Sequence, residues 1–328
     1  MKKKVFTIIT GLLFISVTIQ SQQLYQLTQY MIRPVIYNPA VSGQKDAVCF
    51  YGSGRNQWIG FTDMDGQNVN PRNYIAGVTA PIYSMNSGIG FQYNMEQIGY
   101  QSRSDFRIDY AYKLELKNNQ ILSVGVSGQL SQLKLDVDKL KPIDISDPLV
   151  LKQGIQKDML PEAGIGVFYS SGDTWWAGIS AMNLLGSTAK LGNIKLNDQT
   201  TIIANGQYKI NVIKERFRKL DLAPSFLVKT NFTNTQVELD LLAYVNTNYW
   251  FGTGYRLQDG VAIIGGAQIN NFIIGISYDL TTGKVNEVTK AGTAELHLSY
   301  CLPVLPRSKS EGKLNKVKYH SGFNTRHL

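Results

Sequence analysis

The segment Asp105–Leu116, DFRIDYAYKLEL, decides the fold, because two kinds of side chain alternate along it. Every even-numbered residue, from Phe106 to Leu116, is aromatic or aliphatic, and all but one of the odd-numbered residues are charged. Successive side chains of a β-strand point to opposite faces. The segment therefore predicts a strand with one apolar face and one charged face.

The same alternation recurs at Thr235–Asn246, Asn271–Leu280 and Ala294–Leu302. A soluble β-sandwich would show this pattern as well as a membrane-spanning barrel. Three features favour the barrel: an N-terminal export signal, opposite charges side by side on the polar faces, and large aromatic residues near segment ends, where membrane interfaces favour them. These aromatic residues are Trp58, Trp175, Trp176, Tyr249 and Trp250.

We expect an all-β fold, a transmembrane antiparallel β-barrel of about 14 strands over residues 46–302. Bacterial outer-membrane barrels have an even number of strands, and this number agrees with that rule. The predicted strands are residues 46–60, 72–81, 87–96, 103–116, 120–133, 161–170, 174–182, 199–213, 219–230, 235–246, 248–257, 260–269, 271–280 and 292–302.

The connections between these strands alternate between a mostly short and a longer set. The short set includes residues 117–119, 171–173 and 246–248, and the long set includes 62–71, 136–160 and 183–198. Outer-membrane barrels have short periplasmic turns and longer outer loops. Under this rule we expect both chain termini in the periplasm and the barrel in the cell outer membrane.

Residues 1–21 have the features of a signal peptide. Three lysines precede about fifteen mostly apolar residues, and Ser21 precedes the expected cleavage site at Gln22. An anchor helix is the alternative, but the apolar run is shorter than the roughly 20 residues that span a membrane. After cleavage no apolar run of about 18 residues remains, which excludes a helical membrane protein. Residues 22–45 are expected to form a periplasmic N-terminal segment.

The formal net charge of +9 is concentrated at the two ends of the chain. The leader carries three positive charges and the tail a net five, which leaves one for the body, so no nucleic-acid partner is implied. Solvated charge is one interpretation of the basic residues, and a docking surface for a periplasmic partner is the other. The candidate docking residues, in one turn and in the basic periplasmic tail 303–328, are Lys214, Arg216, Arg218, Lys219, Arg307, Lys309, Lys313, Lys316 and Lys318.

No catalytic, cofactor or metal motif is present. The sequence lacks a Gly-x-Ser-x-Gly elbow, a glycine-rich phosphate loop and a His-Glu-x-x-His pair, so we expect neither an enzyme nor a cofactor. His297, between Glu295 and Ser299 on one strand face, could act as a hydrolase base. Residues two apart on a strand are about 7 Å apart, however, which is too far for the hydrogen bonds of such a site. A lumenal histidine with a structural role is the plainer interpretation.

The two cysteines, Cys49 and Cys301, fit neither a disulfide-rich scaffold nor a metal site. Closure of a barrel places the first strand beside the last, because an exposed sheet edge does not occur in lipid. Both cysteines fall on the charged face and toward the periplasmic end of their strands. We therefore expect them to be neighbours across this seam. Whether they are bonded stays open, because register shear can displace them by several residues.

The segment Tyr30–Phe61, YMIRPVIYNPAVSGQKDAVCFYGSGRNQWIGF, resembles the opening of the PorP/SprF family of outer-membrane proteins. It contains an Asn-Pro turn, a strand-like run and an Arg-Asn-Gln-Trp cluster. Weaker echoes follow at residues 88–91, 98–99, 109–112, 144–148, 161–166 and 178–180. Val41-Ser42-Gly43 departs from the aromatic or Ala-rich turn expected there. The candidate family-motif and partner-contact residues are Asn38, Pro39, Arg55, Asn56, Gln57 and Trp58.

The resemblance implies a non-catalytic outer-membrane barrel of Bacteroidota that serves type IX secretion and gliding motility. Such a protein would support secretion or surface anchoring of client proteins, such as large adhesins, through contacts with them and with periplasmic type IX components. A general diffusion porin is the alternative, because charged inner faces can line an open lumen. Two roles for Arg55 stay open: pairing with lumenal carboxylates such as Asp109 or Glu238, or contact with a plug or client chain.

Overall fold

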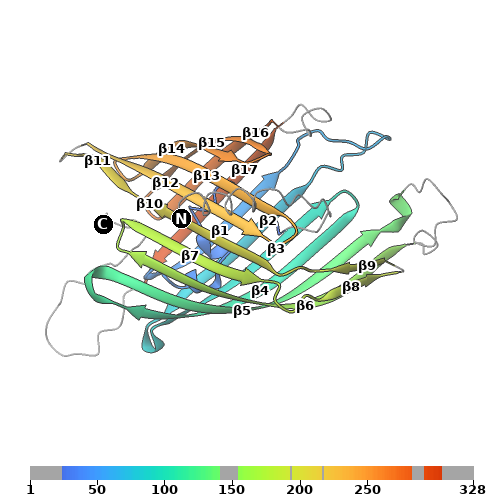
Figure 1. Cartoon of the computed structure of the whole chain (residues 1–328), viewed down its shortest axis with the longest axis horizontal. Coiled ribbons are helices and arrows are strands. Elements are labelled where there is room, and N and C mark those ends of the chain that lie inside the picture. The colour runs from blue at the N-terminus through green and yellow to red at the C-terminus, as the bar shows by residue number, and fades with distance from the viewer. Residues whose placement is uncertain (1–23, 141–153, 193, 216–217, 283–291, 305–328) are drawn as a thin grey trace, which may run out of the picture.

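The computed structural model describes residues 24–140, 154–192, 194–215, 218–282 and 292–304, and a β-barrel accounts for most of them (Figure 1). Among these residues no helix is long and apolar enough to cross a membrane. The strands are β1 (Ala47–Asn56), β2 (Arg72–Ile82), β3 (Ser87–Ile98), β4 (Gln101–Glu115), β5 (Gln120–Asp136), β6 (Ile155–Ser171), β7 (Trp175–Met182), β8 (Thr188–Leu191), β9 (Ile194–Asn197), β10 (Thr201–Tyr208), β11 (Ile210–Lys214), β12 (Lys219–Thr230), β13 (Thr235–Val245), β14 (Tyr249–Arg256), β15 (Gly260–Ile269), β16 (Phe272–Thr281) and β17 (Thr293–Pro303).

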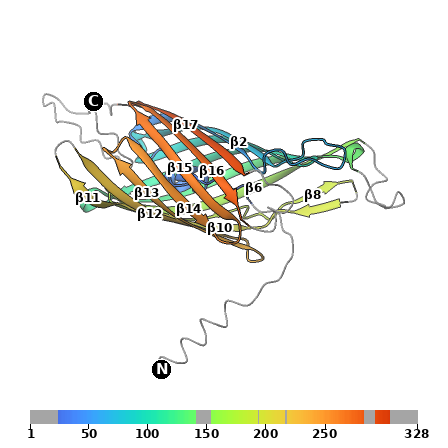
Figure 2. The same cartoon turned by 90° about the horizontal axis from the view of Figure 1, so that it is seen from above.

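The barrel is closed by antiparallel pairing of β1 with β17, the first strand with the last. Strand β10 pairs with both β7 and β12, and β11 continues the same wall position along β12. Strands β10 and β11 are separated by Lys209, whose amide donates to the carbonyl of Thr174 (2.7 Å). With β10 and β11 counted as one, the wall has fourteen strands, which confirms the predicted fold and strand number. Figure 2 shows the strands tilted in the wall.

The two faces of the wall are opposite in character, and the apolar face points outward. Along β4, Phe106 and Ile108 are 47% and 65% exposed, whereas Arg107 and Asp109 are 2% and 1% exposed. A soluble protein would bury the apolar face, so the outward apolar band indicates contact with lipid. The prediction that the large aromatic residues lie at the membrane interfaces was partly wrong. Trp175 and Tyr249 face outward, but Trp176 and Trp250 occupy the next positions of their strands and are therefore buried in the lumen.

The two ends of the barrel differ in the length of their connections. At one end every connection has two to four residues, and at the other lie the long connections 57–71, 137–154, 183–200 and 282–292. We call these the short-turn end and the long-loop end. Strands β5 and β6, with 17 residues each, are longer than the wall strands β7 and β14, with eight each.

A second, two-stranded sheet, β8–β9, lies at the long-loop end beside β6, inside the segment predicted as an outer loop (Figure 1). Its apolar residues Ala189 and Leu191 pack with Leu133, Leu135 and Leu160 of β5 and β6 into a small separate core. The sheet is held further by Arg103 of β4, whose guanidinium makes two bonds of 2.6 and 2.7 Å to Asp198. The sequence alternation of this hairpin is only four residues long on each side, too short to predict it.

The largest apolar core lies inside the barrel. It is built by residues 24–46, which we call the plug, packed against lumenal side chains such as Phe168, Trp176 and Trp250. All residues from Leu27 to Gly43 are buried. The expectation of a periplasmic N-terminal segment was therefore wrong for these residues. Their apolar side chains would be exposed to water outside the barrel, and within it they fill the lumen.

Candidate functional site: a lumen filled by the N-terminal segment

The plug begins at the long-loop end, where Lys229 of β12 holds its first residues. The Lys229 ammonium donates to the carbonyl oxygens of Leu24 (2.6 Å) and Tyr25 (3.3 Å) and to Gln26 Oε1 (2.8 Å). Lys229 is buried and precedes the connection 231–234, at the same end of the barrel as the 57–71 loop. Three acceptors satisfy all three donors of the ammonium group. The segment thus has a defined start at this mouth.

A layer of paired charges holds the next part of the plug. Arg55 Nη2 lies 2.7 Å from Asp279 Oδ2, and Arg55 Nη1 lies 3.1 Å from Glu295 Oε2. The backbone amides of Thr28 (2.8 Å) and Gln29 (3.0 Å) donate to the same Glu295 carboxylate. Each carboxylate oxygen thereby has a donor, as burial of the charge requires. The plug completes this network, because without it Glu295 would lose two of its donors.

A second ionic contact lies across the lumen on β4. Arg107 donates to the carbonyl oxygens of Val35 and Ile36 (2.8 Å each) and pairs with Asp109 (2.9 Å). Ser42 of the plug donates to the other Asp109 oxygen (3.1 Å). Both carbonyls belong to the 3-10 turn η1 (Pro34–Ile36) of the plug. The guanidinium therefore fixes the position of a turn that has few hydrogen bonds of its own.

The Asn-Pro pair forms a third contact between the plug and the wall. Asn38 caps the 3-10 turn η2 (Pro39–Val41) by accepting a hydrogen bond from the Ala40 amide (2.9 Å). Its side-chain amide donates to the carbonyls of Val167 (2.9 Å) and Ile179 (3.3 Å). Backbone carbonyls of barrel strands ordinarily accept hydrogen bonds from neighbouring strands. The Asn38 side chain thus attaches the plug to the backbone of the wall and not to its side chains.

Glycines of the wall make room for this turn. A methyl group on Gly166 would lie 2.0 Å from Asn38 Oδ1, and one on Gly125 would lie 2.4 Å from the Ala40 nitrogen. The same holds at Gly88, where a methyl group would lie 2.3 Å from the Ser42 carbonyl oxygen. Real Cβ atoms do not approach other atoms this closely, so the plug and the glycines of β3, β5 and β6 fit each other as a pair.

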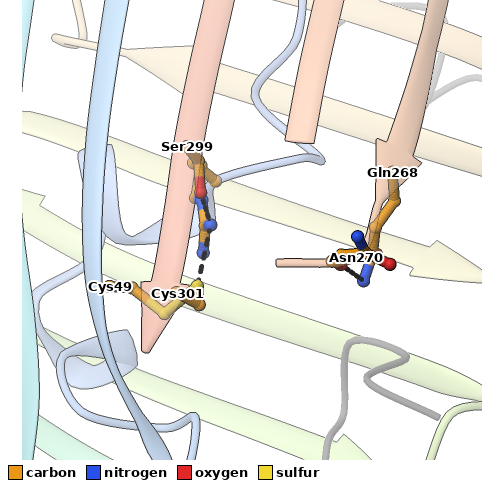
Figure 3. Close-up of a disulfide and its surroundings, with 6 residues drawn as sticks. Cys49, Gln268, Asn270, Ser299 and Cys301 are labelled. Carbon is orange, nitrogen blue, oxygen red and sulfur yellow. Dashed lines mark hydrogen bonds between the residues drawn. A yellow bond between two sulfur atoms is a disulfide. The ribbon is translucent and has the colours of Figure 1, made fainter. Parts of the chain in front are cut away.

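The plug ends at the short-turn end, beside the seam between β1 and β17. Arg33 donates to Ser299 Oγ and to Cys301 Sγ (3.3 Å). Cys301 is directly opposite Cys49 in the strand register and is joined to it by a disulfide, with Cα atoms 4.0 Å apart (Figure 3). Barrel closure thus places the two cysteines together as the sequence analysis expected, and the bond that it left open is present.

The two ends of the described chain are at opposite ends of the barrel. Leu24 is held at the long-loop end, whereas the Val304 amide donates to the carbonyl of Asp46 (3.1 Å), next to the start of β1 at the short-turn end. The expectation that both termini face one compartment therefore does not fit Leu24 and Val304. The chain crosses the lumen once before β1 begins, and this crossing was not included in the strand count that oriented the termini.

Comparison with known families gives one clear match, to type IX secretion system membrane protein PorP/SprF over residues 19–300. This chain belongs to the PorP/SprF family. No curated protein matches the sequence. The family and the fold together make it an outer-membrane barrel of the type IX secretion system.

Two solved structures are similar to this PorP/SprF chain at low identity and with TM-scores below 0.5. The chain is similar to Omp33 of Acinetobacter baumannii, with 10% identity and a TM-score of 0.44, over 79% of this chain and 100% of that one. It is also similar to the toluene transporter TbuX of Ralstonia pickettii, with 11% identity and a TM-score of 0.47, over 83% and 93% of the two chains. Similarity at this level carries no inference about function.

The motif residues of this PorP/SprF chain divide into two groups in space. One group lies at the plug: Asn38 and Pro39 belong to it, and Arg55 contacts it. Arg55 pairs with lumenal carboxylates and also donates to Thr28 of the plug (2.9 Å). Its carboxylate partners are not the expected Asp109 and Glu238, which pair with Arg107 and Arg256 instead.

The other three motif residues continue to the long-loop rim. Asn56 accepts from Asn70, the Gln57 amide donates to Pro71 (2.8 Å), and the Trp58 amide donates to Thr293 Oγ1 (3.3 Å). These contacts hold the 57–71 loop against the mouth. A partner contact by these three residues stays a prediction.

The candidate docking residues are at the short-turn end where they are described. Lys214, Arg218 and Lys219 are exposed at the β11–β12 turn. The remaining candidates lie outside the described residues: Arg216, Arg307, Lys309, Lys313, Lys316 and Lys318. Binding of a periplasmic partner there stays a prediction.

The geometry around His297 does not assemble a hydrolytic site. Glu295 is engaged by Arg55 and by two plug amides, and Ser299 accepts from Arg33. His297 is 2% exposed, and neither side chain is free to orient or activate it. No group of His, Cys, Asp and Glu able to hold a metal occurs in the part of the chain that the structure describes.

Proposed function

We propose that this protein is a non-catalytic scaffold of the type IX secretion machinery, which supports secretion or surface anchoring of client proteins such as large adhesins through protein–protein contacts. The observation that carries the proposal is the plug. It fills the lumen with an apolar core and satisfies buried wall charges by its own backbone. A barrel built in this way offers its two rims, and not a passage, to partners.

The general diffusion porin is the alternative, and the plug argues against it. A porin leaves an aqueous channel through its lumen. Two cavities among the described residues, one toward each end of this barrel, are small, about 10 and 50 Å³. The side chains that could line a channel, such as Arg55 and Arg107, are bonded to the plug.

We further propose that the long-loop end faces the cell exterior and the short-turn end the periplasm. Outer-membrane barrels keep short turns on the periplasmic side. In this orientation Val304 leads into the periplasm, where the basic tail can meet periplasmic type IX components. Leu24 lies at the outer mouth, so the plug threads its N-terminal end outward through the barrel.

An epitope-labelling experiment tests this orientation. One epitope is inserted after Asp65 in the exposed 57–71 loop, another after the expected cleavage site, and a third at the C-terminus. Antibody on intact cells should label the first two and reach the third only after permeabilisation. Labelling of the C-terminal epitope on intact cells would reverse the orientation, and an unlabelled N-terminal epitope beside a labelled loop would argue against outward threading.

Deletion of the gene tests the scaffold proposal. Proteins on the cell surface and in the culture fluid are compared between the deletion strain, the parent strain and the strain complemented with the full-length gene. We expect at least one type IX client to be lost from the surface or released into the fluid, and complementation to restore it. Unchanged display of every type IX client would refute the proposal.

A further inference from the structure

Two lysines lie directly opposite each other on the outward face of the wall, near the long-loop end. Lys134 of β5 is the register partner of Lys157 of β6, and both side chains are exposed. Direct partners in antiparallel strands have Cβ atoms about 4.5–5.5 Å apart, and like charges in this position destabilise a sheet. Among the described residues no carboxylate forms an ion pair with either lysine. The wall thus holds two positive charges together at a cost in stability.

The strand register extends this lysine pair into a polar row across five strands. From β2 to β6, the members of this cationic row are Arg72, Gln97, Ser102, Lys134 and Lys157. Arg72 donates through its Nε to Asn70 (3.1 Å), which leaves its two terminal nitrogens as further donors. The nearest carboxylate on the same face of β5 belongs to Asp136, which pairs with Lys139 (3.1 Å). The row itself contains donors and three positive charges, and no carboxylate.

The cationic row lies just beyond the apolar band of the wall. On β5 the last aliphatic residue of the outward face is Leu130, which is 42% exposed and opposite Phe106 of β4. Lys134 follows four residues later, about 13 Å along the strand and about 9 Å in height at a tilt of about 45°. Headgroups extend roughly 5–8 Å beyond each side of the hydrocarbon core. The row therefore lies at the depth of the lipid headgroups, and Figure 2 shows the tilt of the strands.

Outward-facing cations at the long-loop end of the described wall strands are confined to this part of the circumference. The last outward residues of the other strands are uncharged, for example Asn56 of β1, Thr230 of β12 and Thr235 of β13. The β8–β9 hairpin packs on the inward face of β5 and β6, against Leu133 and Leu160, so it leaves the lysine pair uncovered. Positive charge is thus concentrated above one apolar part of the wall, on a surface open to the membrane interface.

We propose that this part of the wall binds a phosphorylated lipid of the outer leaflet, of the lipid A type. Lys134 and Lys157 donate to the oxygens of one phosphate by charge-assisted hydrogen bonds, and the acyl chains lie on the apolar band below, beside Phe106 and Leu130. The apolar band favours a lipid over an acidic protein segment, because a segment bound above the membrane would not contact it. The proposal rests on the orientation proposed above, in which the long-loop end faces the cell exterior.

Native mass spectrometry of the full-length protein, released from detergent micelles, tests the site. The probes are lipid A with its phosphates, the same lipid A after removal of the phosphates, and phosphatidylglycerol. We expect saturable binding of phosphorylated lipid A, tighter than that of the other two lipids. Equal binding of the two forms of lipid A, tighter binding of phosphatidylglycerol, or displacement of lipid A by inorganic phosphate at the same concentration would overturn the proposal. Because binding is measured on the purified protein, its failure is distinct from a failure of the scaffold role, which the deletion strain tests.

Double variants locate the binding. Replacing both Lys134 and Lys157 by glutamine should weaken binding of phosphorylated lipid A about 30-fold, because each basic residue near an anionic lipid surface contributes about a factor of five. Replacing both by arginine should retain binding, because the charges are kept.

The matched control replaces Lys190 and Lys195 by glutamine. These exposed lysines are also direct register partners, but they lie on the β8–β9 hairpin, away from the apolar band. This variant loses the same number of charges and should bind lipid A as the parent does. Folding of every variant is checked by heat-modified mobility on gels. Parental binding in the folded Lys134→Gln/Lys157→Gln variant, or equal weakening in the control, would refute this location.

Discussion

Replacement of Gly166 by alanine should loosen the plug from the wall. The new methyl group would lie 2.0 Å from Asn38 Oδ1, so the Asn38 side chain must move. Three hydrogen bonds depend on its present position: one from the Ala40 amide and two to the carbonyls of Val167 and Ile179. Each is worth about 1 kcal/mol, so opening of this turn should become easier by about 3 kcal/mol.

Hydrogen exchange measures this opening. Because 1.4 kcal/mol corresponds to a factor of ten, amides in the peptide covering residues 37–44 should exchange on the order of 100-fold faster in Gly166→Ala. Gly128→Ala is the matched control on the neighbouring strand β5, since a methyl group there would meet no atom within 4 Å. Wild-type exchange in Gly166→Ala, or equal acceleration in Gly128→Ala, would refute the proposed fit between the plug and the glycines.

Three further predictions concern the seam, the charge layer and the tail. Replacing Cys49 and Cys301 by serine opens a covalent loop with a sequence separation of 252 residues, and chain entropy predicts a loss of unfolding free energy of up to about 5 kcal/mol, measurable by urea titration in detergent; an unchanged midpoint and slope would contradict it. Arg55→Met leaves Asp279 and Glu295 without a shared cation and should cost about 3–5 kcal/mol in the same assay, and a loss below about 1 kcal/mol would show that the layer does not depend on this cation. A pull-down with residues 303–328 should capture a periplasmic or peptidoglycan-associated partner and weaken steeply with salt, because exposed charges are screened beyond about 8 Å at physiological ionic strength; salt-insensitive capture, or none, would count against a docking role.

Much of the wall could be predicted from sequence because each strand carries its own signal. Alternation from Phe106 to Leu116 fixes which face meets lipid, and short turns such as Lys117–Asn119 fix where strands end. That Cys49 and Cys301 are neighbours followed from closure together with the face and strand end they share, whereas the bond between them depends on register and stayed open. These inferences use local periodicity and one topological rule.

The interior could not be predicted in the same way, because it depends on contacts between distant residues. The plug has no period of two, and its turns at Pro34 and Pro39 give it the pattern of a loop. One signal was available: Gly88, Gly125 and Gly166 fall on the inner face, where small residues allow another backbone to approach closely. The partners of Arg55 depend on register across the seam, which sequence spacing does not determine.

Planar-bilayer recording of the purified full-length protein tests the central claim, a barrel closed by its own N-terminal segment, most directly. The plug and its bonds to Lys229, Arg55 and Arg107 predict membranes that stay silent under voltage after the protein has inserted. Insertion is verified independently by protease protection in the same lipid. Stable channels of nanosiemens scale from the inserted wild-type protein would contradict a filled lumen and favour the diffusion porin.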